Sequence, residues 1–525
     1  MPAMIDWFDR GWKINSRGVA YHMDGQEWTF NEIGELTCRT ANALLAAGFK
    51  KETIGAVWSD NHPLSWACTL SLWRAGLAWT PVHPTAPLDE TAFLLDSFDA
   101  EIMFFTKAYE KSVLSIKDKL PKVRLWICID GEAEGAISLD HFAKNQPATK
   151  PAVQYKPEDM VVILPTGGTT GLPKGVMQTN RTYTASVAGF EMYAFYPNDV
   201  YPVNLAASPM THTSGLLTLP CTGRGGKVVV LTRAEPKAML EAIVKQRVTE
   251  FFLPPTVLYR LVDAPGIEKV DFSSIKYLMY GSAPMSVEKL KKALKLFGPV
   301  LMQAFGQTEG PAPVSCLRPE DHFKRGPNGE LEELADDSRL ASAGRVTWIT
   351  RVEIMDDNNN ILPAGKTGEI CLYGDNVMKG YYKNPEKTAQ TIINGWLHTG
   401  DLGHIDEDGY LFITDRKKDM IITGGFNVYP IEVEQVLWGH PAVGECAVIG
   451  VPNPDWGEEV KAVVELKPGM TVTAEELIAL CKQKLGSIMA PKSIDFTDAI
   501  PRSRNGKVLK KDLREKYWQG IAKKI

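Results

Sequence analysis

A short apolar run that leads into a glycine- and threonine-rich segment is the feature that most restricts how this chain can fold. Met160–Leu164 has the composition of a buried strand, and Pro165–Gly175 follows it directly. Glycines adopt backbone conformations closed to other residues and let amide N–H groups approach an anion closely. Threonine hydroxyls and the ammonium group of Lys174 add further donors. The pattern predicts a buried strand followed by a phosphate-binding loop.

This loop is not a Walker A motif, which has the pattern G-x-x-x-x-G-K-[ST]. Pro173 precedes the lysine here, and Gly175 follows it. A flexible surface loop is the alternative interpretation. The buried strand before the cluster favours a bound anion instead, and the β- and γ-phosphates of ATP suit its donors.

Short apolar strands alternate with amphipathic helices along the chain, which is typical of an α/β protein. Ile275–Tyr280 predicts a strand, and Gly281–Pro284 predicts the turn after it. Ser286 is the expected N-cap of the next helix, and Val300–Ala304 the next strand. Four apolar residues at helical spacing predict the buried face of that helix: Leu290, Ala293, Leu294 and Phe297.

A chain of 525 residues exceeds what one hydrophobic core usually organises, so at least two domains are expected. We predict a boundary near Lys418, which makes residues 1–417 a large domain of parallel-sheet α/β layers. Residues 418–525 are predicted to form a small mobile α+β domain, with a helix that begins at the capping box Thr473–Glu476. The acidic segment Asp321–Leu340 is predicted to be a surface loop.

The bulk properties exclude several classes of protein. The formal net charge is -5, whereas nucleic-acid-binding proteins usually carry a basic domain or stripe. The N-terminus lacks a signal-peptide core, and no run approaches the roughly 20 apolar residues that span a bilayer. The eight cysteines include no C-x-x-C pair, which argues against a disulfide scaffold or zinc site. A soluble cytoplasmic protein is expected, and the oligomeric state stays open, with a homodimer among the options.

The segment Thr166–Lys174 resembles the signature loop of the adenylate-forming enzymes, which comprise acyl-CoA synthetases, carrier-loading adenylation domains and beetle luciferases. The resemblance covers nearly the whole chain, and several further motifs occur in the family's order. It implies a site for ATP and Mg²⁺. The family often has serine where Gly167 stands, so one hydroxyl contact to phosphate is expected to be absent. The implied loop residues are Thr166, Gly167, Gly168, Thr169, Thr170, Gly171 and Lys174.

A second string, Phe305–Glu309, resembles the family's aromatic-Gly-x-Thr-Glu motif. An aromatic face can stack on adenine, a threonine hydroxyl can hold the α-phosphate, and a carboxylate can bind Mg²⁺. Taken alone, this string would more often be a turn with an exposed acid. The resemblance implies Phe305 for adenine, Thr308 for the α-phosphate, Glu309 for Mg²⁺, and Gly306 and Gln307 for the nucleotide.

Ribose contacts are implied by the Thr399–Asp401 segment, which resembles the family's T-G-D motif. A carboxylate at Asp401 can accept two hydrogen bonds from the ribose hydroxyls, and Arg416 resembles a second ribose contact. Without the resemblance, Asp401 would be an ordinary turn residue and Arg416 part of a solvated charged face. The segment that resembles the lining of both adenine and acyl group is Gly281, Ser282 and Ala283.

The resemblance also implies a hinge and a catalytic lysine. Lys418 stands where family members pivot their C-terminal domain between two half-reactions, and Gly424 and Gly425 resemble the loop that lines the thiol channel. Pro501–Lys507 resembles the motif that carries the catalytic lysine. With the ordinary pKa of a lysine, Lys507 is cationic at neutral pH, so its implied role is electrostatic stabilisation of the carboxylate and α-phosphate.

The acyl pocket is expected to involve Thr211, His212, Gly281 and Ala304. His212 resembles a histidine that family members place beside the acid, and a structural role is the alternative. The small side chain of Thr211 suggests a wide pocket. The sequence leaves the acid itself open among fatty, aromatic and alicyclic types.

These patterns predict an ATP-dependent carboxylate–CoA ligase that works through an acyl-adenylate on an apolar carboxylic acid. Coenzyme A is the expected thiol because Gly424–Pro430 resembles acyl-CoA ligases and no carrier domain follows the lysine motif. A stand-alone enzyme that loads a carrier protein is one alternative. A nucleotide-binding regulator without turnover is another, and the joint presence of Lys174, Glu309 and Lys507 argues against it.

Overall fold

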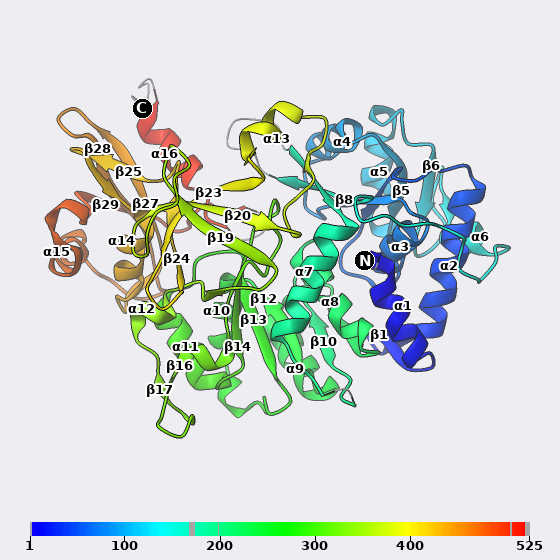
Figure 1. Ribbon diagram of the computed structural model, residues 1–525, viewed down its shortest axis with the longest axis horizontal. Coiled ribbons are helices and arrows are strands. Elements are labelled where there is room, and N and C mark those ends of the chain that lie inside the picture. Colours follow the sequence, from blue (N-terminus) through cyan, green and yellow to red (C-terminus); the bar gives the residue numbers. More distant parts are fainter. Residues whose placement is uncertain (1–2, 167–173, 198, 504–506, 520–525) are drawn as a thin grey trace.

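The computed structural model describes residues 3–166, 174–197, 199–503 and 507–519. Among these residues the strands form two large sheets, two five-stranded sheets and one short hairpin, which confirms the predicted α/β class. In Figure 1 one large sheet lies at the right, the other at the lower centre, and the C-terminal sheet at the left. No helix of the described residues is long and apolar enough to cross a membrane.

The first large sheet carries the expected phosphate loop. Its strand order is β21 (Gly380–Tyr381), β9 (Lys174–Thr179), β8 (Met160–Thr166), β4 (Ala78–Val82), β3 (Ile54–Trp58), β5 (Ala100–Phe105), β6 (Leu125–Cys128) and β7 (Ile137–Ser138). The neighbours from β8 to β7 are parallel, whereas β9 runs antiparallel to β8. Both faces of β5 are buried, since Phe104 joins one core cluster while Met103 and Phe105 join another. Such two-sided burial explains the continuous apolar runs in these strands.

Helices cover this sheet, among them α2 (Phe30–Ala46), α3 (Pro63–Arg74), α4 (Leu88–Ser97) and α5 (Glu110–Ile116). Helix α3 is buried at every residue except Leu64, including Arg74. The guanidinium of Arg74 forms two hydrogen bonds with the carboxylate of Asp9, at 3.1 and 2.6 Å. A buried charge needs such a partner, so an arginine is compatible with this apolar helix.

The second large sheet supplies the adenine and acyl segments. Its order is β18 (Arg345–Val346), β15 (Ser315–Leu317), β14 (Leu301–Phe305), β13 (Tyr277–Gly281), β12 (Glu250–Leu253), β10 (Val203–Ala206), β11 (Lys227–Val230), β1 (Val19–Met23) and β2 (Gln26–Thr29). Helix α11 (Val287–Phe297) follows β13, with Ser286 as N-cap through its hydroxyl and the Lys289 N–H. The four apolar residues expected on the inner face of α11 are all buried, so this prediction is confirmed.

A five-stranded sheet follows, with β19 (Thr350–Met355), β20 (Gly368–Gly374), β23 (Trp396–Ile405), β22 (Ile392–Ile393) and β24 (Leu411–Arg416). The last sheet contains β26 (Phe426–Val428), β25 (Ile421–Thr423), β28 (Gly457–Leu466), β27 (Val443–Asn453) and β29 (Ser493–Phe496). Helices α14 (Pro430–Trp438), α15 (Ala474–Met489) and α16 (Lys510–Trp518) accompany it, and Thr473 forms the predicted capping box of α15. The change of sheet between β24 and β25 is compatible with a boundary near Lys418, which stays a prediction.

The prediction that Asp321–Leu340 is a surface loop is wrong in part. The segment contains a paired hairpin, β16 (Phe323–Arg325) and β17 (Leu331–Leu334), and a short helix α12 (Asp337–Leu340). His322 is fully buried, with Nε2 2.9 Å from the Tyr280 hydroxyl, and burial lowers its pKa to about 4. The polar neighbours of His322 in the sequence conceal this partner, which only the tertiary fold supplies.

Candidate active site

The phosphate loop connects two paired strands. Strand β8 ends at Thr166 and β9 begins at Lys174, and these two residues lie opposite each other in the antiparallel ladder. Five residues of the predicted loop, Gly167, Gly168, Thr169, Thr170 and Gly171, lie outside the described residues. The pairing of Thr166 with Lys174 therefore fixes both ends of the loop on neighbouring strands of the first large sheet.

Tyr381 links the lysine of this loop to the expected Mg²⁺ ligand. The Lys174 ammonium lies over the Tyr381 ring, 5.3 Å from its centroid, and the Tyr381 hydroxyl donates to Glu309 Oε1 at 2.9 Å. Burial lowers the pKa of Lys174, the positive charge of Lys387 lowers it further, and Glu309 raises it. Tyr381 was not predicted, because no recognised motif contains it. It reaches the loop through β21, which pairs with β9.

The Phe305–Glu309 segment leaves the end of β14 and is held by main-chain contacts. Gln178 Nε2 donates to the Thr308 carbonyl at 2.6 Å, and the Gln307 N–H donates to the Gly310 carbonyl at 2.9 Å. A Cβ on Gly306 would lie 2.4 Å from the Ala312 nitrogen, so only glycine fits there. Gln307 Nε2 is buried and has no partner among the described residues, as suits a donor that contacts a ligand.

Asp401 and Arg416 face each other across neighbouring strands. They are register partners in β23 and β24, and Arg416 Nε lies 3.5 Å from Asp401 Oδ1. Asp401 is buried, and burial raises its pKa to about 6, against the lowering effect of Arg416 and Lys507. Arg416 is about half exposed, at 51%, and can turn towards a bound ribose. The structure thus brings together both residues implied as ribose contacts.

Lys507 joins this site from the C-terminal part of the chain. Burial of the ammonium group lowers its pKa, the positive charge of Arg416 lowers it too, and Asp401 and Glu309 raise it. The residue as a whole is exposed. The charges that act on Lys507 thus belong to the two predicted ribose contacts and the predicted Mg²⁺ ligand.

Two of the expected acyl-pocket residues, Gly281 and Ala304, lie at the carboxyl ends of β13 and β14, and Thr211 and His212 lie on the connection that follows β10. His212 occupies the N-cap position of α8 (Thr213–Gly223), and its ring centroid is 6.0 Å from that of His83. Ala304 on β14 shares a core cluster with Leu217 of α8. A Cβ on Gly281 would lie 2.4 Å from the Ala304 carbonyl oxygen, which explains a glycine there. The next two residues, Ser282 and Ala283, begin the connection to α11, and Ser282 has a φ of 69°.

The hinge and the expected thiol loop have a distinct environment. Lys418 is exposed, and Arg514 on α16 donates to its carbonyl at 3.2 Å and pairs with Asp419 at 2.7 Å. Gly424 and Gly425 form the exposed two-residue turn between β25 and β26, with φ values of 57° and 83°.

Thr211, the remaining residue of the expected acyl pocket, lies beside His212. Its hydroxyl is buried and has no partner among the described residues.

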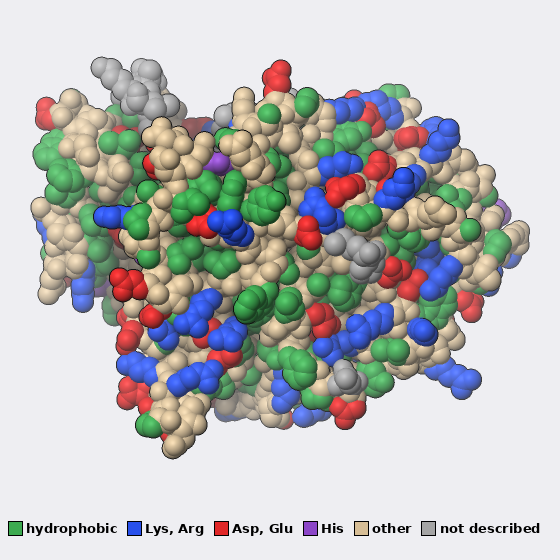
Figure 2. Space-filling view, viewed as in Figure 1, with side chains coloured by type: hydrophobic (Ala, Val, Ile, Leu, Met, Phe, Trp, Pro, Cys, Tyr) green, Lys and Arg blue, Asp and Glu red, His purple; other side chains and the backbone are tan. Residues whose placement is uncertain are grey.

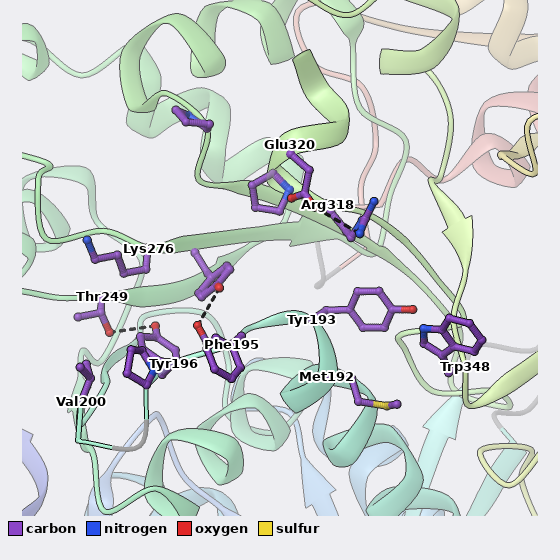
Figure 3. Close-up of a pocket in the computed structure, with 14 residues that line it drawn as sticks. Met192, Tyr193, Phe195, Tyr196, Val200, Thr249, Lys276, Arg318, Glu320 and Trp348 are labelled. Atoms are coloured by element: carbon purple, nitrogen blue, oxygen red, sulfur yellow. Dashed lines mark hydrogen bonds and ion pairs between the residues drawn. The ribbon is translucent and has the colours of Figure 1, made fainter. Parts of the chain in front are cut away.

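A separate groove of 660 Å³ opens at the surface near the end of α7 (Asn180–Tyr193). Figure 3 shows Tyr193, Phe195, Tyr196 and Trp348 around it. None of the candidate site residues within the described ranges lines this groove. Tyr193 and Tyr277 line it and also pack against the apolar cluster that contains Ala304. The groove and the expected acyl-pocket residue Ala304 thus both border one apolar cluster.

Two family models match most of the chain. Residues 8–382 match the model described as AMP-binding enzyme, and residues 432–507 match the AMP-binding enzyme C-terminal domain. The chain therefore belongs to the AMP-binding, adenylate-forming enzyme family, which confirms the resemblance drawn from the motifs.

Individual relatives agree along nearly the full length. A medium/long-chain-fatty-acid–CoA ligase of Mycobacterium tuberculosis, FadD8, is 34% identical over 86% of this chain and 79% of its own. A feruloyl-CoA synthase of Amycolatopsis is 32% identical over 97% of this chain and 98% of its own. The solved structure of the amide bond synthetase McbA from Marinactinospora thermotolerans superposes with a TM-score of 0.87 at 31% identity, over 98% of this chain and 100% of that one. The predicted class of AMP-forming ligase is confirmed.

Proposed function

We propose that this protein is an ATP-dependent carboxylate–CoA ligase that acts on an apolar acid through an acyl-adenylate. The observation that carries the proposal is two groups of charged contacts on the expected nucleotide motifs: Tyr381 joins Lys174 to Glu309, and Arg416 lies 3.5 Å from Asp401. The charges of Glu309, Asp401 and Arg416 also act on Lys507. Such a combination of acids and bases suits a nucleotide with a divalent cation better than it suits a packed core.

In the first half-reaction, a carboxylate oxygen of the acid attacks the α-phosphorus of ATP, and the bond to the bridging oxygen of pyrophosphate breaks. Lys507 offsets negative charge where the carboxylate and α-phosphate meet, and Lys174 offsets charge on the departing pyrophosphate. Mg²⁺ is usually held by one or two carboxylates together with substrate phosphates, so Glu309 fits as its protein ligand. Bound there, the ion would neutralise phosphate charge, and Tyr381 would orient the carboxylate that holds it.

In the second half-reaction, the thiol of coenzyme A attacks the acyl carbonyl, and AMP leaves with the bonding electrons of the mixed anhydride. We infer a rotation about Lys418 between the two steps, since in this conformation the exposed turn Gly424–Gly425 lies against Trp456 of its own domain, with the Gly424 N–H 2.9 Å from the Trp456 carbonyl. The effect of the Asp401 and Glu309 charges on Lys507 supports the assignment of the present arrangement to the first step.

An apolar acid is supported by the side chains behind the site. The cluster that contains Ala304 consists of aromatic, aliphatic and sulfur-containing side chains: Phe190, Ala194, Leu217, Phe252, Met279, Met302, Ala304 and Cys316. A pocket that borders this buried apolar cluster would favour apolar groups and disfavour charged ones. The fatty-acid and feruloyl names of the relatives agree with an apolar chain or ring.

Coenzyme A is the proposed acceptor of the acyl group. The likeness to an amide bond synthetase favours an amine as the second candidate, and loading of a carrier protein is the third. The test measures pyrophosphate release with fatty, aromatic and alicyclic acids, and then identifies the product with coenzyme A, an amine or a holo-carrier protein. We expect acid-dependent release and a coenzyme A thioester. Release that never depends on an acid would overturn the ligase, and amide or carrier product alone would overturn the choice of thiol.

A Lys507→Ala variant tests the assigned catalytic group. Loss of one preorganised charge is expected to lower acyl-adenylate formation by roughly 100- to 1,000-fold. Thioester formation from supplied acyl-adenylate should remain. Lys511→Ala is the matched control, because Lys511 is an exposed lysine four residues further along the chain and pairs with the exposed Glu515 at 3.6 Å. Equal adenylation in wild type and Lys507→Ala would refute the assignment.

A further inference from the structure

An amide side chain joins the C-terminal part of the molecule to the start of α11. Gln435 on α14 uses both ends of its amide: Nε2 donates to the Met285 carbonyl at 2.9 Å, and Oε1 accepts from the Val287 N–H at 3.3 Å. Val287 is the first residue of α11, so no carbonyl within the helix can accept its N–H. The side chain from the other domain supplies that acceptor.

A second contact lies close by, and in this one the side chain comes from α11 and the main-chain group from the C-terminal part. Lys289 on α11 donates to the Gly444 carbonyl on β27 at 2.7 Å, and its ammonium lies 4.2 Å from the centroid of the Tyr259 ring. The Tyr259 hydroxyl in turn accepts from the Ser286 N–H at 2.8 Å. Each side therefore contributes one side chain to main-chain groups of the other, which determines both position and orientation.

These contacts hold the connection between β13 and α11, which is expected to border the nucleotide. The residues Gly281–Ala283, expected to line adenine and acyl group, directly precede Met285, Ser286 and Val287. A C-terminal domain held at Met285 and Val287 is therefore positioned against the same connection that borders the nucleotide. The groups involved are neutral amides and one lysine, which water can replace when the contact opens. Such an interface stabilises one arrangement of the two domains and can still open.

We propose that Gln435, with Lys289, forms a latch that holds the C-terminal domain where Lys507 reaches the site during adenylation. Gln435 is a positioning residue, since it acts through Lys507 and contacts no reacting atom. This inference rests on the proposed two-step function. Opening of the latch would accompany the rotation about Lys418 that admits the thiol.

The test separates the two half-reactions in Gln435→Met, which keeps the length of the side chain and removes both polar ends. We expect the turnover number of acid-dependent pyrophosphate formation to fall by ~10-fold, the size of effect that one or two hydrogen bonds produce. The KM values for ATP and acid should change little. Thioester formation from supplied acyl-adenylate and coenzyme A should be unchanged or faster.

Gln483→Met is the matched control, because Gln483 is exposed on α15, away from this interface. Lys289→Met should reproduce the pattern, and the double variant should lose less than the sum of the two, because both residues hold one interface. Thermal unfolding of each variant identifies damage to the fold, and Gln435→Glu, which keeps one acceptor, should be intermediate.

Equal loss in both half-reactions, or no loss in adenylation, would overturn the latch. Failure of the underlying function is distinguishable, since wild-type protein would then show no acid-dependent pyrophosphate formation. A wild-type enzyme that adenylates normally beside an unaffected Gln435→Met variant would refute the latch alone.

Discussion

At the scale of single residues, the pKa of Asp401 is subject to two opposing effects. Burial disfavours its charged form, whereas the positive charges of Arg416 and Lys507 favour that form, and the pKa is raised to about 6. An ordinary aspartate is fully ionised at this pH. The ribose contact assigned to Asp401 therefore depends on pH in a range where an exposed carboxylate would be constant.

This balance predicts a pH dependence of ATP binding. Above a pH of about 6 the carboxylate is ionised and can accept from both ribose hydroxyls, whereas below it the proton removes part of that capacity. The KM for ATP should rise as the pH falls from 7 to 5. Asp401→Asn should raise the KM at pH 7 and abolish the step near 6. Steady-state kinetics with wild type and variant across this range provide the measurement, and an unchanged step in the variant would assign it to another group.

The hydroxyl of Tyr381 gives a second prediction, which concerns the binding of magnesium-bound ATP. Tyr381→Phe keeps the aromatic face over Lys174 and removes the hydroxyl that donates to Glu309. A hydrogen bond to a charged group contributes about 1.5–3 kcal/mol, so the KM for magnesium-bound ATP should rise by roughly 10- to 100-fold. Titration with Mg²⁺ at constant ATP measures this change. Tyr382→Phe is the control, since the Tyr382 hydroxyl donates to Asp99 instead.

At the scale of elements, the hairpin β25–β26 depends on its two glycines. Two consecutive positive φ values are the geometry of the two-residue turns that suit twisted hairpins. Gly424 also lies against Trp456, because a Cβ there would come within 2.3 Å of the indole ring. A left-handed conformation costs a non-glycine residue about 1–2 kcal/mol, before any clash is counted.

Gly424→Ala should therefore lower the free energy of unfolding and slow thioester formation, while adenylation stays near the wild-type rate. Gly469→Ala is the control, since Gly469 has a φ of 77° and no atom near its missing Cβ. It should share the backbone cost and leave both half-reactions intact. Thermal unfolding and separate half-reaction assays measure these effects. Slower adenylation in Gly424→Ala would contradict the assignment of this turn to the thiol step.

At the scale of the whole molecule, alternation between two domain arrangements should depend on the backbone at Lys418. Lys418→Pro restricts φ to about −65° and removes the N–H, which donates no hydrogen bond within the described part of the chain. Adenylation should persist if the present arrangement accommodates proline, and thioester formation should fall by at least ~10-fold. Rapid quench of each half-reaction measures both. Wild-type rates of both half-reactions in the Lys418→Pro variant would place the pivot elsewhere.

Much of this molecule could be predicted from local patterns. The N-cap at Ser286, the inner face of α11 and the capping box at Thr473 follow from side chains a few residues apart, where helix geometry allows little choice. The family resemblance likewise rests on short contiguous motifs. Tyr381, the buried His322 and the ion pair of Arg74 with Asp9 could not be found this way, because their partners are distant in the chain.

The sequence by itself determined the α/β class, the family and the kind of chemistry, because a glycine-rich loop after a buried strand and its companion motifs have few other uses. Only the tertiary structure decided which charges meet. The charges of Asp401 and Glu309 act on Lys507 in an arrangement in which Gln435 bonds to the main chain before α11 and Lys289 bonds to Gly444. Electrostatic effects depend on distance and burial, which no local pattern encodes.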